Sequence, residues 1–173
     1  MSKDIIQLII EDHSRGRAMY AQHKMPETTG EQKQYLAWHM IRESSVHNAK
    51  EEEVLYPTMR IKLGSGVAEH CLAEHQELKQ RLAALTSSSV SDPNFDGMLR
   101  EYMQRVSAAS ISCSWDVSLK MPSYMLQQAR LPRLCRPHPW APNKPPLNII
   151  ANTTAMPLDF MRDLVRFEGA PPL

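Results

Sequence analysis

The chain has 173 residues, of which 42% are hydrophobic, and its 20 basic and 19 acidic residues give a formal net charge of +1. This length fits one domain with a modest appendage, and the apolar content can form a core without the support of disulfides. Because the charges nearly balance, the composition argues against nucleic acid or an anionic membrane as a partner.

The N-terminal sequence and the cysteines indicate the expected compartment. The chain begins Met-Ser-Lys-Asp-Ile-Ile-Gln with no uninterrupted apolar stretch behind it, so we expect neither a signal peptide nor a membrane span. Cys71, Cys113 and Cys135 lie far apart and form no Cys-x-x-Cys pair, which favours neither a disulfide framework nor a zinc knuckle. We therefore expect a cytoplasmic protein in which Cys71 is buried and inert.

Four segments repeat their apolar residues at helical spacing. The first covers about residues 3–24, and the second begins near Glu31 after a turn at 26–30. The third covers roughly 65–85 and has the cleanest apolar stripe. The fourth opens with Ser-Asp-Pro at 91–93, a helix cap followed by a favourable first-turn residue.

These segments predict an all-α protein that folds as an up-and-down four-helix bundle. Helices of about 20 residues are roughly 30 Å long and suit this architecture when short loops join them. We assign residues 1–110 to the bundle and residues 111–173 to a divergent, proline-rich C-terminal extension. A short amphipathic helix is expected near 157–167, docked on the bundle.

The helical pattern stops after Val106. Residues 107–131 have no lasting apolar period and few charges, and proline dominates from Leu131 to Leu147. Because proline fixes φ and lacks a backbone N–H, we expect the second stretch to be extended or turn-like.

Residues of the kinds that bind metals lie on three of the four apolar stripes. His13 is on the first stripe, His47 and Glu51 are on the second, and His75 is on the third. His47 and Glu51 are four residues apart, so both project from one helix face toward the same centre. Imidazole and carboxylate groups suit iron, zinc or manganese, and two irons would need a bridging carboxylate such as Glu51.

Other residues have simpler interpretations. His70 and Glu74 repeat the His-x3-Glu spacing but only flank the third stripe. His23 and His39 lie off the stripes, so we expect them on the surface, and we expect the acids that follow Glu51 to lie on a solvated helix face. A lone histidine on an apolar face is most often a hydrogen-bonded core residue. From the pattern alone, both metal binding and a set of ordinary core histidines stay open.

Several motifs resemble those of the hemerythrin-like (HHE cation-binding) domain family. Residues 35–59, with Arg-Glu at 42–43, His-x3-Glu-Glu at 47–52 and Leu-Tyr-Pro at 55–57, are similar to the second helix of that family. Glu-Asp-His at 11–13 resembles its first helix, and His-x3-Glu-His at 70–75 resembles its third. The proline-rich tail at 136–146, followed by Pro-Leu-Asp, is similar to that of fungal-type members.

The resemblance implies a non-haem di-iron centre held by histidines and bridging carboxylates. Matched position by position, it assigns four metal ligands and two second candidates: His13, His47, Glu51 and His75, then His70 and Glu74. The implied binding partners are a metal ion and dioxygen. Members of the family bind oxygen, sense iron or oxygen, store iron, or have no assigned role.

The expected fourth helix departs from the family. There the family carries a further histidine and a carboxylate, commonly as His-x-x-Glu-Glu, whereas here no histidine lies between His75 and His138. His138 belongs to the proline-rich tail, which relatives combine with an intact site, so it is a poor substitute. The loss of the apolar period at 107–131 indicates that a local stretch of sequence has been replaced. An alternative splice, a short frameshift and a gene-model error would each produce this, and all three stay open. We therefore expect an incomplete di-iron site that holds one iron or none.

Three functions stay open at this stage. The first is a hemerythrin-like iron-binding protein that binds or senses oxygen or iron, with no catalytic residues assigned. The alternative is a degenerate, metal-free helical interaction module. The third is a residual activity of an open iron site toward oxygen or peroxide. The sequence leaves the oligomeric state open.

Overall fold

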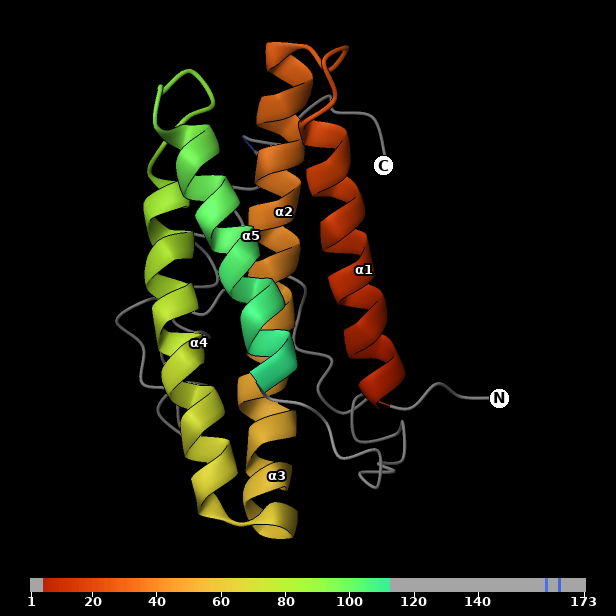
Figure 1. Cartoon of the computed structure of the whole chain (residues 1–173), viewed down its shortest axis with the longest axis vertical. Coiled ribbons are helices and arrows are strands. Elements are labelled where there is room, and N and C mark those ends of the chain that lie inside the picture. The colour runs from red at the N-terminus through yellow and green to blue at the C-terminus, as the bar shows by residue number, and fades with distance from the viewer. Residues whose placement is uncertain (1–4, 113–160, 162–164, 166–173) are drawn as a thin grey trace.

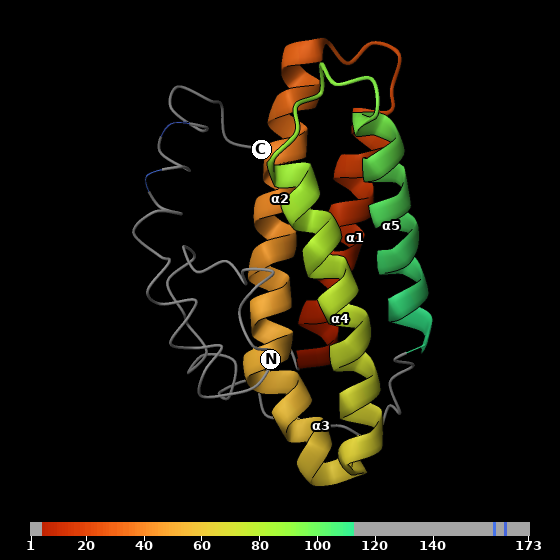
Figure 2. The ribbon, with the colours of Figure 1, turned by 90° about the vertical axis from the view of Figure 1, so that its left-hand side faces the viewer.

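The computed structural model describes residues 5–112 together with Met161 and Val165. Within this part the chain runs up and down as four helical rods that lie side by side (Figure 1 and Figure 2). The second rod has three parts, because a π-helical turn separates two α-helices. The elements are α1 (Ile5–His23), α2 (Gly30–Lys50), η1 (Glu51–Leu55), α3 (Tyr56–Leu63), α4 (Ser65–Thr86) and α5 (Phe95–Ser112). The expected all-α bundle is confirmed.

The rods pack in the order in which they follow one another along the chain. α1 lies along α2, α4 lies along the second rod, and α5 lies along α4. Figure 2 shows α2 and α5 at opposite sides of the bundle, with α1 behind α4 between them. Side chains from α1, α2 and α4 can therefore meet in the interior.

The extension expected at 111–173 lies almost entirely outside the described residues, so its boundary at residue 110 stays a prediction. Of the short helix expected near 157–167, the structure describes only Met161 and Val165. Both are helical and their side chains are 65% and 79% exposed, and the docking of this helix stays a prediction.

Local sequence signals set the ends of the second rod. Thr29 caps α2 through a capping box: its Oγ1 accepts from the backbone N–H of Gln32, and Gln32 Oε1 accepts from the backbone N–H of Thr29. At the other end Gly64 adopts φ of 93°, a conformation that glycine reaches without the steric penalty of a side chain. The chain therefore turns sharply between α3 and α4.

Two apolar clusters fill the interior, one toward each end of the bundle. The larger cluster contains Met19, Leu36, Ala37, Met40, Ile41, Leu78, Leu82, Leu85, Phe95, Leu99, Tyr102 and Met103. The smaller one contains Ile9, Leu55, Tyr56, Met59, Ala68, Cys71 and Leu72. Three buried polar residues lie between the two clusters: His47 and Glu51 on the second rod, and His75 on α4. Each falls between cluster residues in the sequence and therefore also along its rod. A polar layer thus separates the two apolar regions.

The π-helical turn η1 changes the register of the second rod at this layer. The backbone N–H of Tyr56 donates to the carbonyl of Glu51, five residues back, and Pro57 has no N–H with which to continue the ordinary α-helical pattern. Glu51 and Glu52 are consequently both buried, at 4% and 0% exposure. The expectation that Glu52 lies on a solvated face is wrong, because it assumed an unbroken α-helical period.

The buried face of α1 includes a histidine that we expected on the surface. His23 is buried against Phe95, with 6.3 Å between ring centroids, whereas Ile10 is exposed. His23 follows Met19 by four residues and so continues the buried face that contains Ile9 and Met19. The prediction of a surface position for His23 is therefore wrong, and His39 is partly buried as well.

Cys71 is buried, as expected, but it is disulfide-bonded, and its partner lies outside the described residues. This corrects the expectation of unpaired cysteines. No helix among the described residues has both the length and the hydropathy needed to cross a bilayer.

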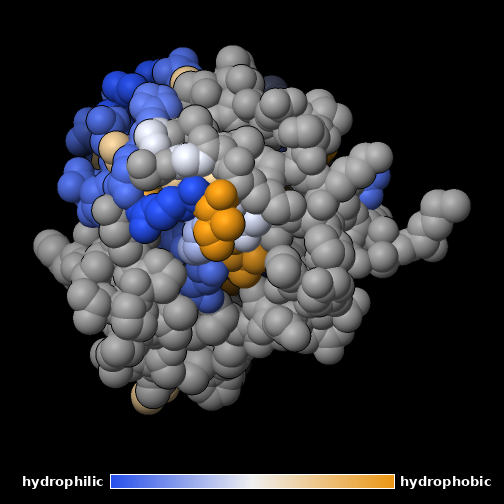
Figure 3. Space-filling model, turned by 90° about the horizontal axis from the view of Figure 1, so that it is seen from below, coloured by the Kyte–Doolittle hydropathy of each residue, from blue (hydrophilic) through white to orange (hydrophobic). Residues whose placement is uncertain are grey.

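A hydrophobic side chain is exposed to solvent at the α3 end of the bundle. Ile61 is 85% exposed there. Figure 3, which views the molecule from this end, shows a small hydrophobic patch beside hydrophilic side chains. Single exposed hydrophobic residues of this kind are common on monomeric proteins.

Thr29→Ala should lower the free energy of unfolding by about 1 kcal/mol, because it removes an N-cap hydrogen bond from α2. Urea unfolding followed by circular dichroism measures this change. The exposed neighbour Glu27 serves as the control, and Glu27→Ala should leave the urea midpoint within experimental error. Equal effects of the two substitutions would contradict a specific capping role for Thr29.

Candidate metal centre

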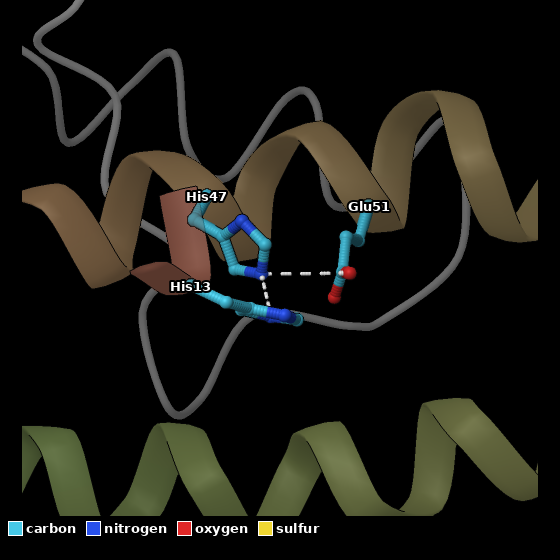
Figure 4. Close-up of side chains that lie close together, drawn as sticks. All are labelled: His13, His47 and Glu51. Carbon is cyan, nitrogen blue, oxygen red and sulfur yellow. Dashed lines mark hydrogen bonds and ion pairs between the residues drawn. The ribbon is translucent and has the colours of Figure 1, made fainter. Parts of the chain in front are cut away.

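The polar layer brings together the four side chains that the sequence singled out on separate helices. His13 comes from α1, His47 from α2, Glu51 from η1 and His75 from α4. His13 Nε2 lies 3.0 Å from His47 Nε2, and His47 Nε2 lies 3.4 Å from Glu51 Oε1 (Figure 4). The other carboxylate oxygen, Glu51 Oε2, lies 2.8 Å from His75 Nε2. Glu51 therefore lies between imidazoles of two different helices.

The spacing of these atoms fits the coordination shell of one metal ion. Ligand atoms of His13, His47 and Glu51 all lie within 4.8 Å of one another. Bonds from nitrogen or oxygen to a transition metal are about 2.0–2.2 Å long, so neighbouring ligand atoms lie roughly 3–3.5 Å apart. The distances around Glu51 fall in or near this range. His75 is not part of this close group and reaches it through its contact with Glu51 Oε2.

In two of the histidines, a carboxylate contacts the Nδ1 atom of the ring, and Nε2 faces the other candidate ligands. His47 Nδ1 lies 3.3 Å from Asp12 Oδ2, which accepts a 2.9 Å hydrogen bond from Lys50 Nζ. A carboxylate at one ring nitrogen fixes the tautomer and leaves the other nitrogen free to bind a cation.

His75 has an equivalent but fully buried partner. Its Nδ1 lies 3.3 Å from Glu52 Oε1, and Lys79 Nζ lies 3.3 Å from the same oxygen. Sequence reasoning missed Asp12, Glu52 and Lys79. The available signals were that Asp12 adjoins His13 and that Lys79 follows His75 by four residues on the apolar stripe of α4.

The second candidates behave differently from each other. Glu74 is partly buried and lines the cavity around the four side chains. His70 lies on the outer surface with a 60% exposed side chain, and its Nε2 is 3.8 Å from Glu74 Oε2. The structure therefore brings Glu74, but not His70, to the candidate centre.

The cavity has a volume of about 60 Å³, and its α5 wall is almost entirely apolar. This wall consists of Tyr102, Met103, Val106 and Ala109. Among the described residues of α5, none offers an imidazole or carboxylate to the cavity.

Burial and pairing oppose each other in setting the charges of the centre. Burial raises the pKa of Glu51, but the electrostatic interaction with His47 and the contacts of His75 and Tyr56 outweigh it and lower the pKa to about 2. Burial likewise lowers the pKa of His75, yet its bonds to Glu51 and Glu52 raise the value to about 9. In the metal-free protein at neutral pH, Glu51 is therefore ionised and His75 protonated.

The outer side of the centre has its own charge pattern. Burial, and then the electrostatic interaction with His47, lower the pKa of His13 to about 4, so this imidazole is neutral at pH 7. Burial would raise the pKa of Asp12, but His47 and Lys50 lower it to about 2. A neutral imidazole and an ionised carboxylate are the forms that a metal ion requires.

Comparison with known proteins supports a cation site. The family model described as the hemerythrin HHE cation-binding domain matches residues 4–108. An uncharacterised hemerythrin-like protein of Schizosaccharomyces pombe is 27% identical over 179 residues, covering 93% of this chain and 86% of that protein. The similarity thus extends beyond the helical bundle. No solved structure matches.

The metal-free protein should be most stable near pH 6.5. Because the pKa of His13 is lowered, its contribution to stability is present above pH 6.5 and is lost as the pH falls toward 4. The lowered pKa values of Asp12 and Glu51 extend this loss toward pH 2. The raised pKa of His75 gives stability that is present below 6.5 and is lost as pH rises through about 9.

Urea midpoints measured from pH 3 to pH 10 in the presence of a chelator test this profile. The alkaline loss should be on the order of a few kcal/mol, because each pKa unit corresponds to about 1.4 kcal/mol. His75→Gln should remove the alkaline loss and keep the acid loss. A profile that is flat between pH 6.5 and 9 in the parent would contradict the charge assignment of His75.

Proposed function

The chain belongs to the hemerythrin HHE cation-binding family, and on that premise we propose that it binds one iron ion through three imidazoles and one carboxylate: His13, His47, His75 and Glu51. The convergence of these side chains from three rods inside one buried cavity is the observation that carries the proposal. Iron is chosen over zinc or manganese because of the family, since the donor set suits all three. Bound iron would supply affinity for dioxygen and one-electron redox chemistry.

The wall formed by α5 supports one ion in place of two. A di-iron centre needs ligands for the second ion, and the α5 side of the cavity offers Met103, Val106 and Ala109. These side chains cannot replace the imidazole and carboxylate groups that iron prefers. Glu51, which would bridge two irons, serves a single ion in this proposal.

The cavity also supports access of a small ligand to the ion. Its volume of about 60 Å³ exceeds the roughly 10–15 Å³ that one water molecule requires. Asn48 lines this cavity at 2% exposure, and among the described residues no acceptor receives a hydrogen bond from its Nδ2. A buried donor without a partner favours a polar occupant. We therefore propose oxygen binding or sensing, with no catalytic role assigned.

A metal-free interaction module is the second candidate function. The polar layer can satisfy itself, because His13 contacts His47 and His75 contacts Glu51. Such internal pairing relieves most of the cost of burying charged groups, so the bundle can fold without an ion. Metal content of freshly purified protein distinguishes the two functions.

His47→Ala should lower the affinity for iron by more than about 100-fold, because it removes a metal ligand. Loss of a residue that only hydrogen-bonds a ligand typically lowers metal affinity by about 10–100-fold. Elemental analysis and chelator competition measure this change. The thermal stabilisation that added iron gives the parent should disappear with it.

His70→Ala is the matched control, since this histidine also resembles a family ligand but is exposed. It should keep the iron content of the parent. Unchanged iron in His47→Ala, or lost iron in His70→Ala, would contradict the proposed ligand set.

Ligands restored to α5 should raise the iron content from about one toward two ions per chain. Val106→His combined with Ala109→Glu places both groups on the cavity wall, three residues apart on one helix face. Arg105→His combined with Ala108→Glu has the same spacing on the exposed face and should leave the content unchanged. An equal gain in both double variants would indicate adventitious binding.

A further inference from the structure

The ion pair between Glu52 and Lys79 is fully buried. Both side chains have 0% exposure, and Lys79 Nζ lies 3.3 Å and 3.4 Å from the two carboxylate oxygens. The carboxylate is shared, because Glu52 Oε1 also lies 3.3 Å from His75 Nδ1. A lysine, a carboxylate and an imidazole therefore form one buried chain of contacts.

Stability alone does not account for this pair. Removing two charges from water costs several kcal/mol for each ion, and well-packed apolar residues of similar volume are often as stable or more stable. Lys79 follows Leu78 and precedes Leu82 on the buried face of α4, where an apolar side chain would fit the pattern. Its position four residues after His75 points to a role at that imidazole.

The geometry restricts the ring of His75. Glu52 reaches it from the π-helical turn of the second rod, while Lys79 reaches Glu52 from the next turn of α4. With Nδ1 held by Glu52, Nε2 is the nitrogen that faces Glu51, at 2.8 Å. Asp12 and Lys50 make a similar arrangement at His47, but there the side chains are 13% and 35% exposed, so water can replace part of it.

We propose that Glu52 and Lys79 are a positioning pair for His75. Lys79 holds the carboxylate of Glu52 in place, and Glu52 fixes the imidazole with Nε2 directed into the cavity and strengthens its donation to a cation. This inference rests on the proposed metal site, and it names residues that act through a ligand without touching the ion.

Two double variants separate positioning from packing. Lys79→Met alone should lower the thermal midpoint, because it removes one of the two positively charged partners of the buried Glu52 carboxylate. Glu52→Met/Lys79→Met removes both charges at similar volume and leaves Nδ1 of His75 without its acceptor. Glu52→Gln/Lys79→Met also removes both charges but keeps a side-chain oxygen for Nδ1.

The measurements are the thermal midpoint of each metal-free protein and its affinity for Co²⁺, followed by visible absorption in chelator competition. Both variants should fold with midpoints close to the parent. Glu52→Met/Lys79→Met should bind Co²⁺ about 10–100-fold more weakly, and Glu52→Gln/Lys79→Met should recover part of that loss. Arg81→Met/Glu101→Gln removes an exposed α4–α5 ion pair and should leave the affinity unchanged.

The possible failures are distinguishable. Parent-like Co²⁺ affinity in a folded Glu52→Met/Lys79→Met variant would overturn the positioning role and leave the metal site standing. Failure of both double variants to fold would make the pair structural and would also overturn it. A parent that binds no Co²⁺ and no iron would overturn the proposed function together with this inference.

Discussion

The bundle is organised around two adjacent carboxylates that are almost completely withdrawn from water. Glu51 and Glu52 would each destabilise the fold by several kcal/mol if left unpaired, and small domains have only about 5–15 kcal/mol in total. Each carboxylate must therefore meet its partners across the interface with α4, where His75 and Lys79 are four residues apart. This requirement fixes the register of the second rod against α4, and the π-helical turn lets both carboxylates face the interior at once.

The packing role of α5 is separate from any role in binding metal. Phe95, Leu99, Tyr102 and Met103 belong to the larger apolar cluster, so α5 packs into the bundle through its hydrophobic face. Burial of such side chains contributes roughly 1.5–3 kcal/mol each, which does not depend on a ligand being present. The α5 wall of the cavity can therefore be apolar while the helix keeps its place in the bundle.

Much of the fold and the core of the candidate site could be predicted from apolar periodicity. The stripes located the four rods, and they selected His13, His47, Glu51 and His75, which the structure brings together. Periodicity failed at Glu52 because it assumes an unbroken α-helix, while the π-helical turn shifts every later position. It failed at Asp12 and Lys79 for another reason, since pairing across helices depends on how rods rotate and slide against each other, which one sequence does not state.

The charges that surround the histidines limit how many cations the proposed centre can hold. Asp12, Glu51 and Glu52 contact these imidazoles, and Lys50 and Lys79 neutralise two of the three negative charges. One proton on His75 balances the third in the metal-free state. A divalent ion that displaces this proton leaves a single excess positive charge, which partly exposed acids such as Glu74 can offset. A second divalent ion would add two more charges to a layer bounded by apolar clusters, and without carboxylates from α5 nothing among the described residues of that helix would compensate them. The apolar α5 wall therefore limits the proposed centre through charge as well as through coordination.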